Sequence, residues 1–477
     1  MTPSKTPAPI ERPESVQINA WSGGEPPNTN PLPANTPWAQ VKPRDELPLH
    51  MLAPAVPVDQ RRWEHPDVGW GLLLPENEAL EPAGRATAAD APAAIQALLA
   101  ARPGSPVLRW MPRHGNSHLR RYGADGKARD LDIAAPTPGD GEDRIPRYLL
   151  IYASPALIPW EVQYALNMST YVGRLDLEGR ALDNYIEALL SDWRTGACEV
   201  RAPVVWSVDH GAPDISWLME RTVADRLWQS VEQDADLGQR LRLKGAQGTR
   251  AALVSALAER KPGLVVTTSH GMTGPLGDGA SLAAQLGLPV DINHEVLRIE
   301  ELQAWQPSGA IWYAHACCAA GSDSRSRYAG LLAHDANISR IVNGVAAAAG
   351  ATVAPLPRAL LGAPSPLRAF VGHVEPTFDW TMRDPVTKQV LVRVLCDALY
   401  TQLFQQDMRT PIGYALRDHF KEAGAFFGSL NDAIVQVNQN VPGMRNWALY
   451  RRLVALDRQT VVILGDPTVS LPLLQKH

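Results

Sequence analysis

Cysteine is scarce in this sequence of 477 residues, which contains four. So few cysteines in so long a chain do not indicate a disulfide framework. None of them stands in a CxxC pair or beside a His-rich run, so we predict no metal site and no cofactor. A reducing compartment, the cytoplasm, is the expected location, and there the thiols remain free for chemistry.

Long apolar runs and an excess of one charge sign are also lacking. No stretch approaches the roughly 18 apolar residues of a membrane-spanning helix, and the opening MTPSKTPAPIERPES has no apolar core of a secretory signal. The 45 basic and 50 acidic residues give a formal net charge of −5. We therefore expect no nucleic-acid partner and no membrane partner. The hydrophobic content of 45% allows a sizeable core.

Changes in composition divide the chain into three parts. Residues 1–146 form an N-terminal region of unknown fold, whose first 60 residues or so are rich in proline and expected to be irregular. Its end, at residues 135–146, is an acidic, Gly/Pro-rich linker. We expect a smaller α/β subdomain at residues 147–199 and the main domain at residues 200–477.

Strand and helix patterns alternate after that linker. Compact apolar runs predict buried strands at residues 147–153, 202–208, 240–245, 263–269, 309–316, 367–375 and 460–467. Helical spacing of apolar residues predicts helices at residues 88–102, 182–193, 214–233, 249–262, 389–406 and 411–427. This order predicts an α/β fold with a mostly parallel central sheet covered by helices on both faces.

Two predicted strands run directly into residues that can perform chemistry. Residues 263–269 lead into His270-Gly271, and residues 309–316 lead into Cys317-Cys318. Reactive groups in a parallel sheet gather beyond the carboxyl ends of the strands, and one crossover between these two would place them close together. An imidazole beside a thiol raises its thiolate fraction and later protonates the leaving group. We therefore predict a catalytic Cys-His pair.

Alternatives exist for both members of the pair. His210 also follows an apolar strand and competes with His270 for the role of base; otherwise we interpret Asp209 and His210 as pocket lining. Cys317 and Cys318 are adjacent, so their side chains should point to opposite sides if the strand continues that far. Glycines beside the pair would leave backbone N–H groups free for an oxyanion.

The motifs resemble those of caspase-like cysteine peptidases, the group that includes gingipains, metacaspases and CHAT domains. TTSHG, ending at Gly271, is similar to their (S/G)HG signature, and ACCAAG, ending at Gly321, is similar to their Cys-x-x-Gly signature. Residues 151–177 resemble the segment that precedes the gingipain catalytic subdomain, and ILGDPTVSLP resembles the CHAT-type ending.

The resemblance implies a caspase-like α/β/α sandwich at about residues 200–477. It also implies that Cys318 is the nucleophile and His270 the base, with oxyanion donors at the backbone of Gly271 and Cys318. A third member of the site is not evident from the sequence.

The substrate-binding residues depart from the family pattern. Where metacaspases carry Asp and caspases carry Gln, two residues before the nucleophile, this sequence has Ala316. Candidates for substrate binding are Asp209, His210, Ala316, Glu375 and Asp379. Because three of these are acidic, we expect cleavage after Arg or Lys, with a small or apolar residue as the alternative.

The sequence thus predicts a cytoplasmic cysteine endopeptidase that acts on a protein or peptide substrate. By resemblance to bacterial relatives, defence against phage is one role, with a pore-forming effector as a candidate partner. The competing hypotheses are a catalytically idle caspase-like interaction or scaffold module and a different thiol hydrolase.

Overall fold

One twelve-stranded sheet organises the molecule. The computed structural model describes residues 15–16, 18–21, 23, 30–31, 58–123, 125–194, 196, 198–333, 335–384 and 388–474. In spatial order the strands are β11 (Leu241–Leu243), β10 (Val204–Ser207), β12 (Leu264–Thr268), β15 (Ile311–His315), β18 (Ala369–His373), β19 (Val461–Gly465), β9 (Tyr171–Leu175), β8 (Tyr148–Tyr152), β4 (Trp70–Pro75), β5 (Val107–Trp110), β6 (His118–Tyr122) and β7 (Ala128–Asp132).

Parallel pairs dominate this sheet. The antiparallel pairs are β18 with β19, β5 with β6, and β6 with β7, and the other neighbours run parallel. Every residue of β12, β15, β18 and β19 is buried. Such continuous apolar strands are typical of a sheet covered on both faces.

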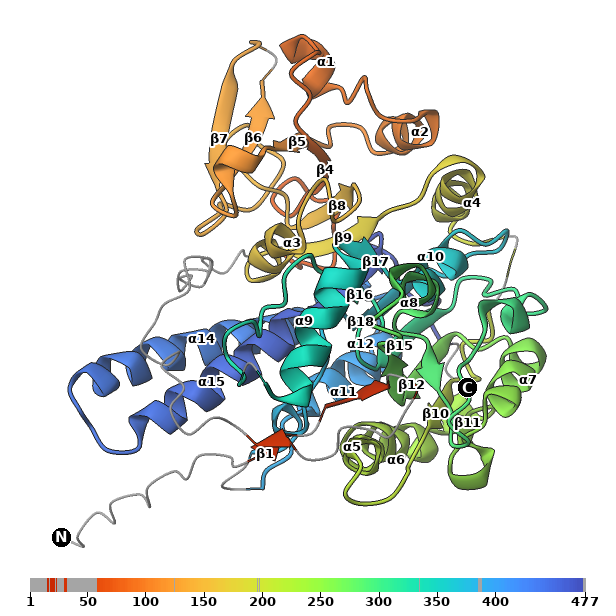
Figure 1. Ribbon diagram of the computed structural model, residues 1–477. Coiled ribbons are helices and arrows are strands. Elements are labelled where there is room, and N and C mark those ends of the chain that lie inside the picture. Colours follow the sequence, from red (N-terminus) through yellow and green to blue (C-terminus); the bar gives the residue numbers. More distant parts are fainter. Residues whose placement is uncertain are drawn as a thin grey trace, which may run out of the picture.

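Helices cover both faces of the sheet (Figure 1). They are α1 (Pro82–Ala86), α2 (Ala93–Ala101), α3 (Trp160–Asn167), α4 (Gly179–Leu190), α5 (Ile215–Met219), α6 (Asp225–Gln233), α7 (Arg250–Arg260), α8 (Gly279–Gln285), α9 (Asn337–Ala349), α10 (Pro355–Leu361), α11 (Arg393–Leu399), α12 (Thr401–Phe404), α13 (Ile412–Ala415), α14 (Arg417–Asn438) and α15 (Met444–Gln459). A π-helical turn, η3 (Glu220–Ala224), links α5 to α6. Helices α14 and α15 form a long hairpin that extends to one side.

Short strands lie outside the main sheet. They are β1 (Ser15–Val16), β2 (Ala20–Trp21), β3 (Asn30–Pro31), β13 (His270–Met272), β14 (Pro289–Val290), β16 (Gly321–Ser322) and β17 (Thr352–Val353). Of these, β14, β13 and β2 form a three-stranded sheet in that order. Strand β13 begins two residues after the end of β12, so the small sheet lies directly at the carboxyl end of that strand.

The predicted fold class is confirmed. The structure is α/β with a large, mostly parallel sheet flanked by helices, and the strands predicted from apolar runs are present. Strands β4 to β7 come from the N-terminal region whose fold the sequence did not indicate. The expected linker at residues 135–146 and the expected boundary at 199 both lie between strands of this one sheet. The Pro-rich start, residues 1 to about 60, lies mostly outside the described residues.

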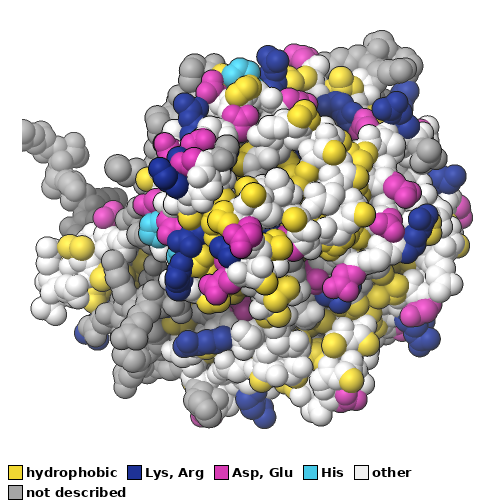
Figure 2. All heavy atoms as spheres, turned by 90° about the horizontal axis from the view of Figure 1, so that it is seen from above, with side chains coloured by type: hydrophobic (Ala, Val, Ile, Leu, Met, Phe, Trp, Pro, Cys, Tyr) yellow, Lys and Arg dark blue, Asp and Glu magenta, His cyan; other side chains and the backbone are white. Residues whose placement is uncertain are grey.

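Two features agree with the composition. Among the described residues, no helix is both long enough and apolar enough to cross a membrane. Figure 2 shows the face above the β5–β7 end, where acidic and basic side chains are interspersed and neither sign dominates.

The pairing of β19 with β9 joins the two halves of the sheet, and it requires a glycine. Ile463 lies opposite Gly173 in the register. A Cβ atom added to Gly173 would lie 2.0 Å from the carbonyl oxygen of Gly465. Backbone cannot move aside as a flexible side chain can, so any larger residue must separate the strands.

We predict that Gly173→Ala lowers the free energy of unfolding by about 1–3 kcal/mol, because overpacking at this contact separates the two halves. Urea denaturation monitored by circular dichroism measures the effect. The control is Gly277→Ala, where an added Cβ meets no atom within 4 Å. Equal stability of the two variants would show that β19 and β9 can accommodate the added Cβ atom without loss of free energy.

Candidate active site

The two predicted reactive segments lie at the same edge of the sheet. Strands β12 and β15 are parallel neighbours, and Thr268 lies opposite His315 in their register. The chain therefore leaves both strands at the same level, with His270 on one side and the two cysteines on the other. A Cβ atom on Gly271 would lie 2.0 Å from the carbonyl oxygen of Cys317, so the two segments are in backbone contact and only glycine fits.

His270 is held by a carboxylate that the sequence did not reveal. Its Nε2 lies 3.0 Å from both Oδ1 and Oδ2 of Asp214, and both side chains are buried. The other ring nitrogen, Nδ1, has no hydrogen-bond partner among the described residues. A carboxylate that accepts from Nε2–H fixes the tautomer, and this leaves Nδ1 as the nitrogen that can accept a proton.

Asp214 was missed because its position suggests a different role. It precedes α5, and its side chain accepts a hydrogen bond from the backbone N–H of Ser216, as a helix N-cap does. Asp214 therefore caps α5 and binds His270 at the same time. The signal in the sequence, an Asp shortly after an apolar strand that pairs with the strand before His270, is weak without the structure.

The electrostatics of Asp214 favour the ionised form. Burial raises the pKa of this carboxyl, but hydrogen bonds from His270 and Ser216 and the charge of His270 more than offset burial and lower the pKa to about 2. Asp214 is therefore a carboxylate at every physiological pH.

His210, the rival for the role of base, lies in the same cluster, and no carboxylate of the described residues is hydrogen-bonded to its ring. Its ring stacks on that of His294 with centroids 4.2 Å apart, and it lies 5.9 Å from the ring of His270. Burial, together with the neighbouring rings of His294 and His270, lowers the pKa of His210 to about 4. A neutral stacked ring beside the site is suited to positioning. The carboxylate partner favours His270 as the base.

The two cysteines occupy a sharp turn after β15. The N–H of Ala319 donates to the carbonyl of Ala316 over 3.4 Å, which closes the turn around Cys317 and Cys318. Cys318 has a φ of +55°, which is uncommon for a side chain other than glycine and is found at active sites and switches.

Both thiols are fully buried in this structure. Sγ of Cys317 accepts a hydrogen bond from the backbone N–H of Thr377 at 3.3 Å. Burial raises the pKa of each thiol well above its ordinary value, so both are neutral here. A reactive thiolate therefore requires that solvent or substrate reach the turn.

The predicted oxyanion donor at Cys318 is already engaged. Its backbone N–H donates to the carbonyl of Glu375 over 3.3 Å. An incoming carbonyl oxygen would compete with this contact. The donor is therefore present at the turn but satisfied by another part of the chain.

The predicted substrate-binding residues are spread around this edge. Ala316 is buried in the turn itself, and Asp379 is half-buried at the start of a 3₁₀ turn, Asp379–Thr381. Asp209 forms an ion pair with Arg221 at 3.0 Å. The Glu375 carboxylate is buried and accepts from Ser326 Oγ at 2.9 Å and from the N–H of Arg327 at 2.8 Å.

These contacts weaken the argument for a basic cleavage site. Burial raises the pKa of Glu375 to about 7, and the charge of Asp209 is balanced by Arg221. A basic substrate side chain would find the Asp209 charge neutralised and the Glu375 carboxylate turned toward its own hydrogen-bond donors. The preference for Arg or Lys stays a prediction.

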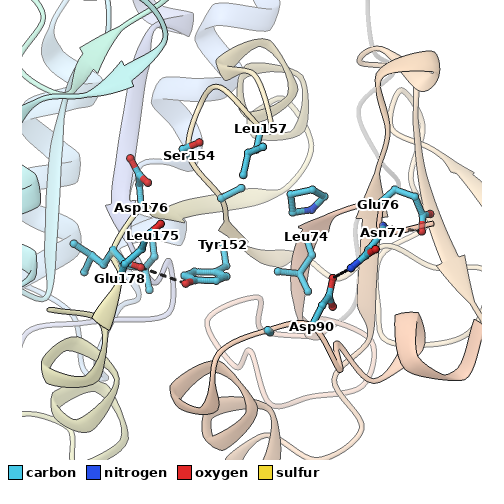
Figure 3. A pocket seen from close by; sticks show the side chains of 14 residues that line it. Leu74, Glu76, Asn77, Asp90, Tyr152, Ser154, Leu157, Leu175, Asp176 and Glu178 are labelled. Carbon is cyan, nitrogen blue, oxygen red and sulfur yellow. Dashed lines mark hydrogen bonds between the residues drawn. The ribbon is translucent and has the colours of Figure 1, made fainter. Parts of the chain in front are cut away.

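A separate pocket of about 290 Å³ lies at the carboxyl ends of β4, β8 and β9. Figure 3 shows Leu74, Tyr152 and Leu175 around it, with acidic side chains at its rim. Asp90 is paired with Arg109 and Asp176 with Arg358. No Cys or His is among its described lining residues, so the pocket does not hold the predicted chemistry.

No group of three or more His, Cys, Asp or Glu side chains among the described residues is placed to hold a metal ion. The residues at the β12–β15 edge are suited to acid–base and thiol chemistry.

No protein-family model matches the chain, and no curated protein matches it. A solved structure to which it is similar is the Saccharomyces cerevisiae separase–securin complex, with 12% sequence identity and a TM-score of 0.34. The match covers 74% of this chain and 16% of that chain, so this chain spans about a sixth of the length of that protein.

We predict that Asp214→Asn lowers the free energy of unfolding at pH 7 by about 2 kcal/mol, because the carboxylate that binds His270 is lost. Asn retains the N-cap function, so the change isolates the ionic contact. A carboxyl with a lowered pKa stabilises the fold above its unfolded value of 3.8, and this contribution is lost as pH falls toward about 2.

Urea denaturation at pH 7 and at stepwise lower pH measures the effect. The difference from the unchanged protein should shrink as pH falls from about 4 to about 2. The matched control is Asp278→Asn, an exposed N-cap on α8 without a histidine partner. A pH-independent difference, or one equal to that of the control, would contradict the ionic role of Asp214.

Proposed function

We propose that the chain is a cysteine endopeptidase of the caspase-like type, with Cys318 as nucleophile and His270 as base. One observation carries the proposal: a buried imidazole, oriented by Asp214 with Nδ1 unpartnered, lies at the end of the strand that neighbours the cysteine turn. The carboxylate orients the ring and leaves Nδ1 without a hydrogen-bond partner among the described residues, which is the arrangement that a general base requires.

The residues define a chemical sequence. Nδ1 of His270 takes the thiol proton of Cys318, and Asp214 stabilises the imidazolium that forms. The thiolate attacks the peptide carbonyl carbon, and a thioester forms as the peptide C–N bond breaks. His270 returns the proton to the leaving amine. Water, activated by the same imidazole, then hydrolyses the thioester and restores the thiol.

The oxyanion step needs a rearrangement at the turn. The backbone N–H of Cys318 would leave the carbonyl of Glu375 and donate to the oxyanion, with the backbone at Gly271 as the second expected donor. The positive φ of Cys318 belongs to the same turn, so this backbone contact with Glu375 lies at the proposed nucleophile itself.

The finer parts of the proposal rest on the resemblance of the sequence motifs. They are a cytoplasmic location, a role in bacterial defence against phage, and a pore-forming effector as the protein substrate. Four free cysteines are compatible with a reducing compartment.

One observation favours a second candidate function, an idle caspase-like scaffold. Cys317, Cys318 and His270 are all buried, and a site that never opens cannot turn over substrate. A different thiol hydrolase would use the same pair on another ester or amide. Variants of the pair distinguish these possibilities.

We predict that Cys318→Ala abolishes cleavage of a mixed peptide library while the protein remains folded, with a loss of stability from the buried sulfur that is no larger than that of Cys317→Ala. Cys317→Ala should retain cleavage and lose about 1 kcal/mol or more of stability, because its sulfur packs in the core and accepts a hydrogen bond. Mass spectrometry of the library before and after incubation measures cleavage. The reverse pattern would make Cys317 the nucleophile, and equal cleavage by both variants would exclude a cysteine mechanism.

We predict that His270→Ala lowers kcat by about 10²–10⁴-fold, the contribution of a general base. His210→Ala should instead change mainly KM, because a stacked ring without a carboxylate partner positions its neighbours and takes no proton. Kinetics on one peptide chosen from the library measure both constants. Equal losses of kcat would show that His210 takes part in the chemistry.

A further inference from the structure

A short N-terminal segment, Ile18–Trp21, lies across the candidate active site. Its strand β2 runs parallel to β13, with Ala20 opposite Gly271. The N–H of Thr273 donates to the carbonyl of Trp21 at 2.7 Å. The segment is therefore hydrogen-bonded to the strand that contains His270, although about 250 residues separate them in the sequence.

The other edge of the same segment pairs with the chain that follows β18. Ile18 forms an antiparallel bridge with Phe378, and the N–H of Asn19 donates to the carbonyl of Thr377 at 3.0 Å. The N–H of Thr377 is the donor to Sγ of Cys317. A single extended segment thus lies between the His270 strand and the backbone that contacts the cysteine turn.

The side chains of the segment fill this edge of the sheet. Ile18 and Ala20 belong to the buried cluster that contains Cys317 and Cys318. Asn19 is fully buried, and its Nδ2 donates to the carbonyl of His315 at 3.4 Å. The ring of Trp21 stacks on His294 at 4.6 Å and lies 6.2 Å from the ring of His270.

This arrangement is how an extended peptide binds by strand addition. Backbone hydrogen bonds on its edges supply the binding, and pockets for alternate side chains supply selectivity. The occupant here is a piece of the chain itself. We propose that Ile18–Trp21 occupies the peptide groove of this site as a built-in substitute for substrate and keeps the site closed until an extended peptide displaces it.

The inference rests on the proposed function for the identity of the groove, and it names the class of substrate. That substrate is an extended peptide whose backbone pairs with β13 and with Thr377–Phe378. The position that Asn19 fills accepts a buried side chain of about that size beside the carbonyl of His315.

The segment is also suited to displacement. Oδ1 of Asn19 is buried and has no hydrogen-bond partner among the described residues, so the fit is imperfect. A buried unsatisfied acceptor costs free energy that a better-matched peptide would not lose. The closed state is held by a few backbone bonds over four residues.

The test measures thiol accessibility, which does not depend on peptidase activity. The full chain and the variants Ile18→Asp and Trp21→Ala are treated with iodoacetamide, and the alkylation rate of each cysteine is followed by mass spectrometry. We expect Cys317 and Cys318 to react slowly in the unchanged protein. In the variants they should react about tenfold faster or more, because the segment Ile18–Trp21, which covers the site, is displaced. The matched control is Val435→Asp, on an exposed position of α14, which should not change the rates.

Cys198 and Cys396, both buried elsewhere, report whether a variant has lost its fold. Faster alkylation of all four cysteines in Ile18→Asp would mean that this variant has lost its fold. The rates at Cys317 and Cys318 in Trp21→Ala, which removes a partly exposed side chain, then provide the test. A synthetic peptide with the sequence VQINAWS should slow the variants again, whereas a scrambled peptide should not. Unchanged rates at Cys317 and Cys318 in folded variants would overturn the proposal.

Library cleavage measured on the same samples separates the two proposals. Faster alkylation without cleavage would support the cover and contradict the peptidase. Equal cleavage by the unchanged protein and the variants, with equal alkylation, would support the peptidase and contradict the cover.

Discussion

The parallel pairing of β12 with β15 is the constraint on which the candidate site depends. Neither His270 nor the cysteine turn lies within a strand of the main sheet, yet the register of the two strands fixes both at one level. Parallel neighbouring strands place both of their carboxyl ends at one edge of the sheet. Residues far apart in the sequence therefore meet there without a long loop. The glycine contact between residue 271 and the carbonyl of Cys317 then brings the two segments into backbone contact.

Burial decides the electrostatic state of this edge. It holds both thiols neutral, and it lowers the pKa of His210 to about 4, so that ring is uncharged as well. Asp214 is the exception, since the bonds it accepts outweigh its own burial. Asp214 therefore holds a negative charge next to His270, the proposed base. In the proposed site the covered thiols are neutral and His270 is already oriented by Asp214, so the proposed activity depends on access to the cysteine turn.

The fold class and most strands could be predicted because buried parallel strands have sequences that are compact apolar runs. Residues 263–269 and 309–316 are such runs, and they become β12 and β15. Asp214 was not predicted, because an Asp before a helix indicates an N-cap and the contact with His270 spans 56 residues. The hydrogen bonds of Glu375 to Ser326 and to the N–H of Arg327 are set by side-chain packing, which no periodicity encodes, and its role in substrate binding stays a prediction. Strands β6 and β7 were not predicted because their sequences, HLRRY and ARDLD, are short and rich in charged residues. Strands β4 and β5 are apolar runs of the predicted kind, and they were missed because the N-terminal region was interpreted as one of unknown fold.

The position of the N-terminal segment Ile18–Trp21 is explained by the proposed site and not by the main sheet. Ile18–Trp21 contributes little to the main sheet, so its pairing with β13 is not needed to complete that sheet. Its residues contact the groups on which the proposed chemistry depends: the His270 strand, the backbone of Thr377 and the cluster around both cysteines. A segment that served stability alone could bind anywhere along a sheet of this length. Its position against the His270 strand and the cluster of both cysteines fits the proposal that the groove is shaped for an extended peptide and that the chain supplies the first one.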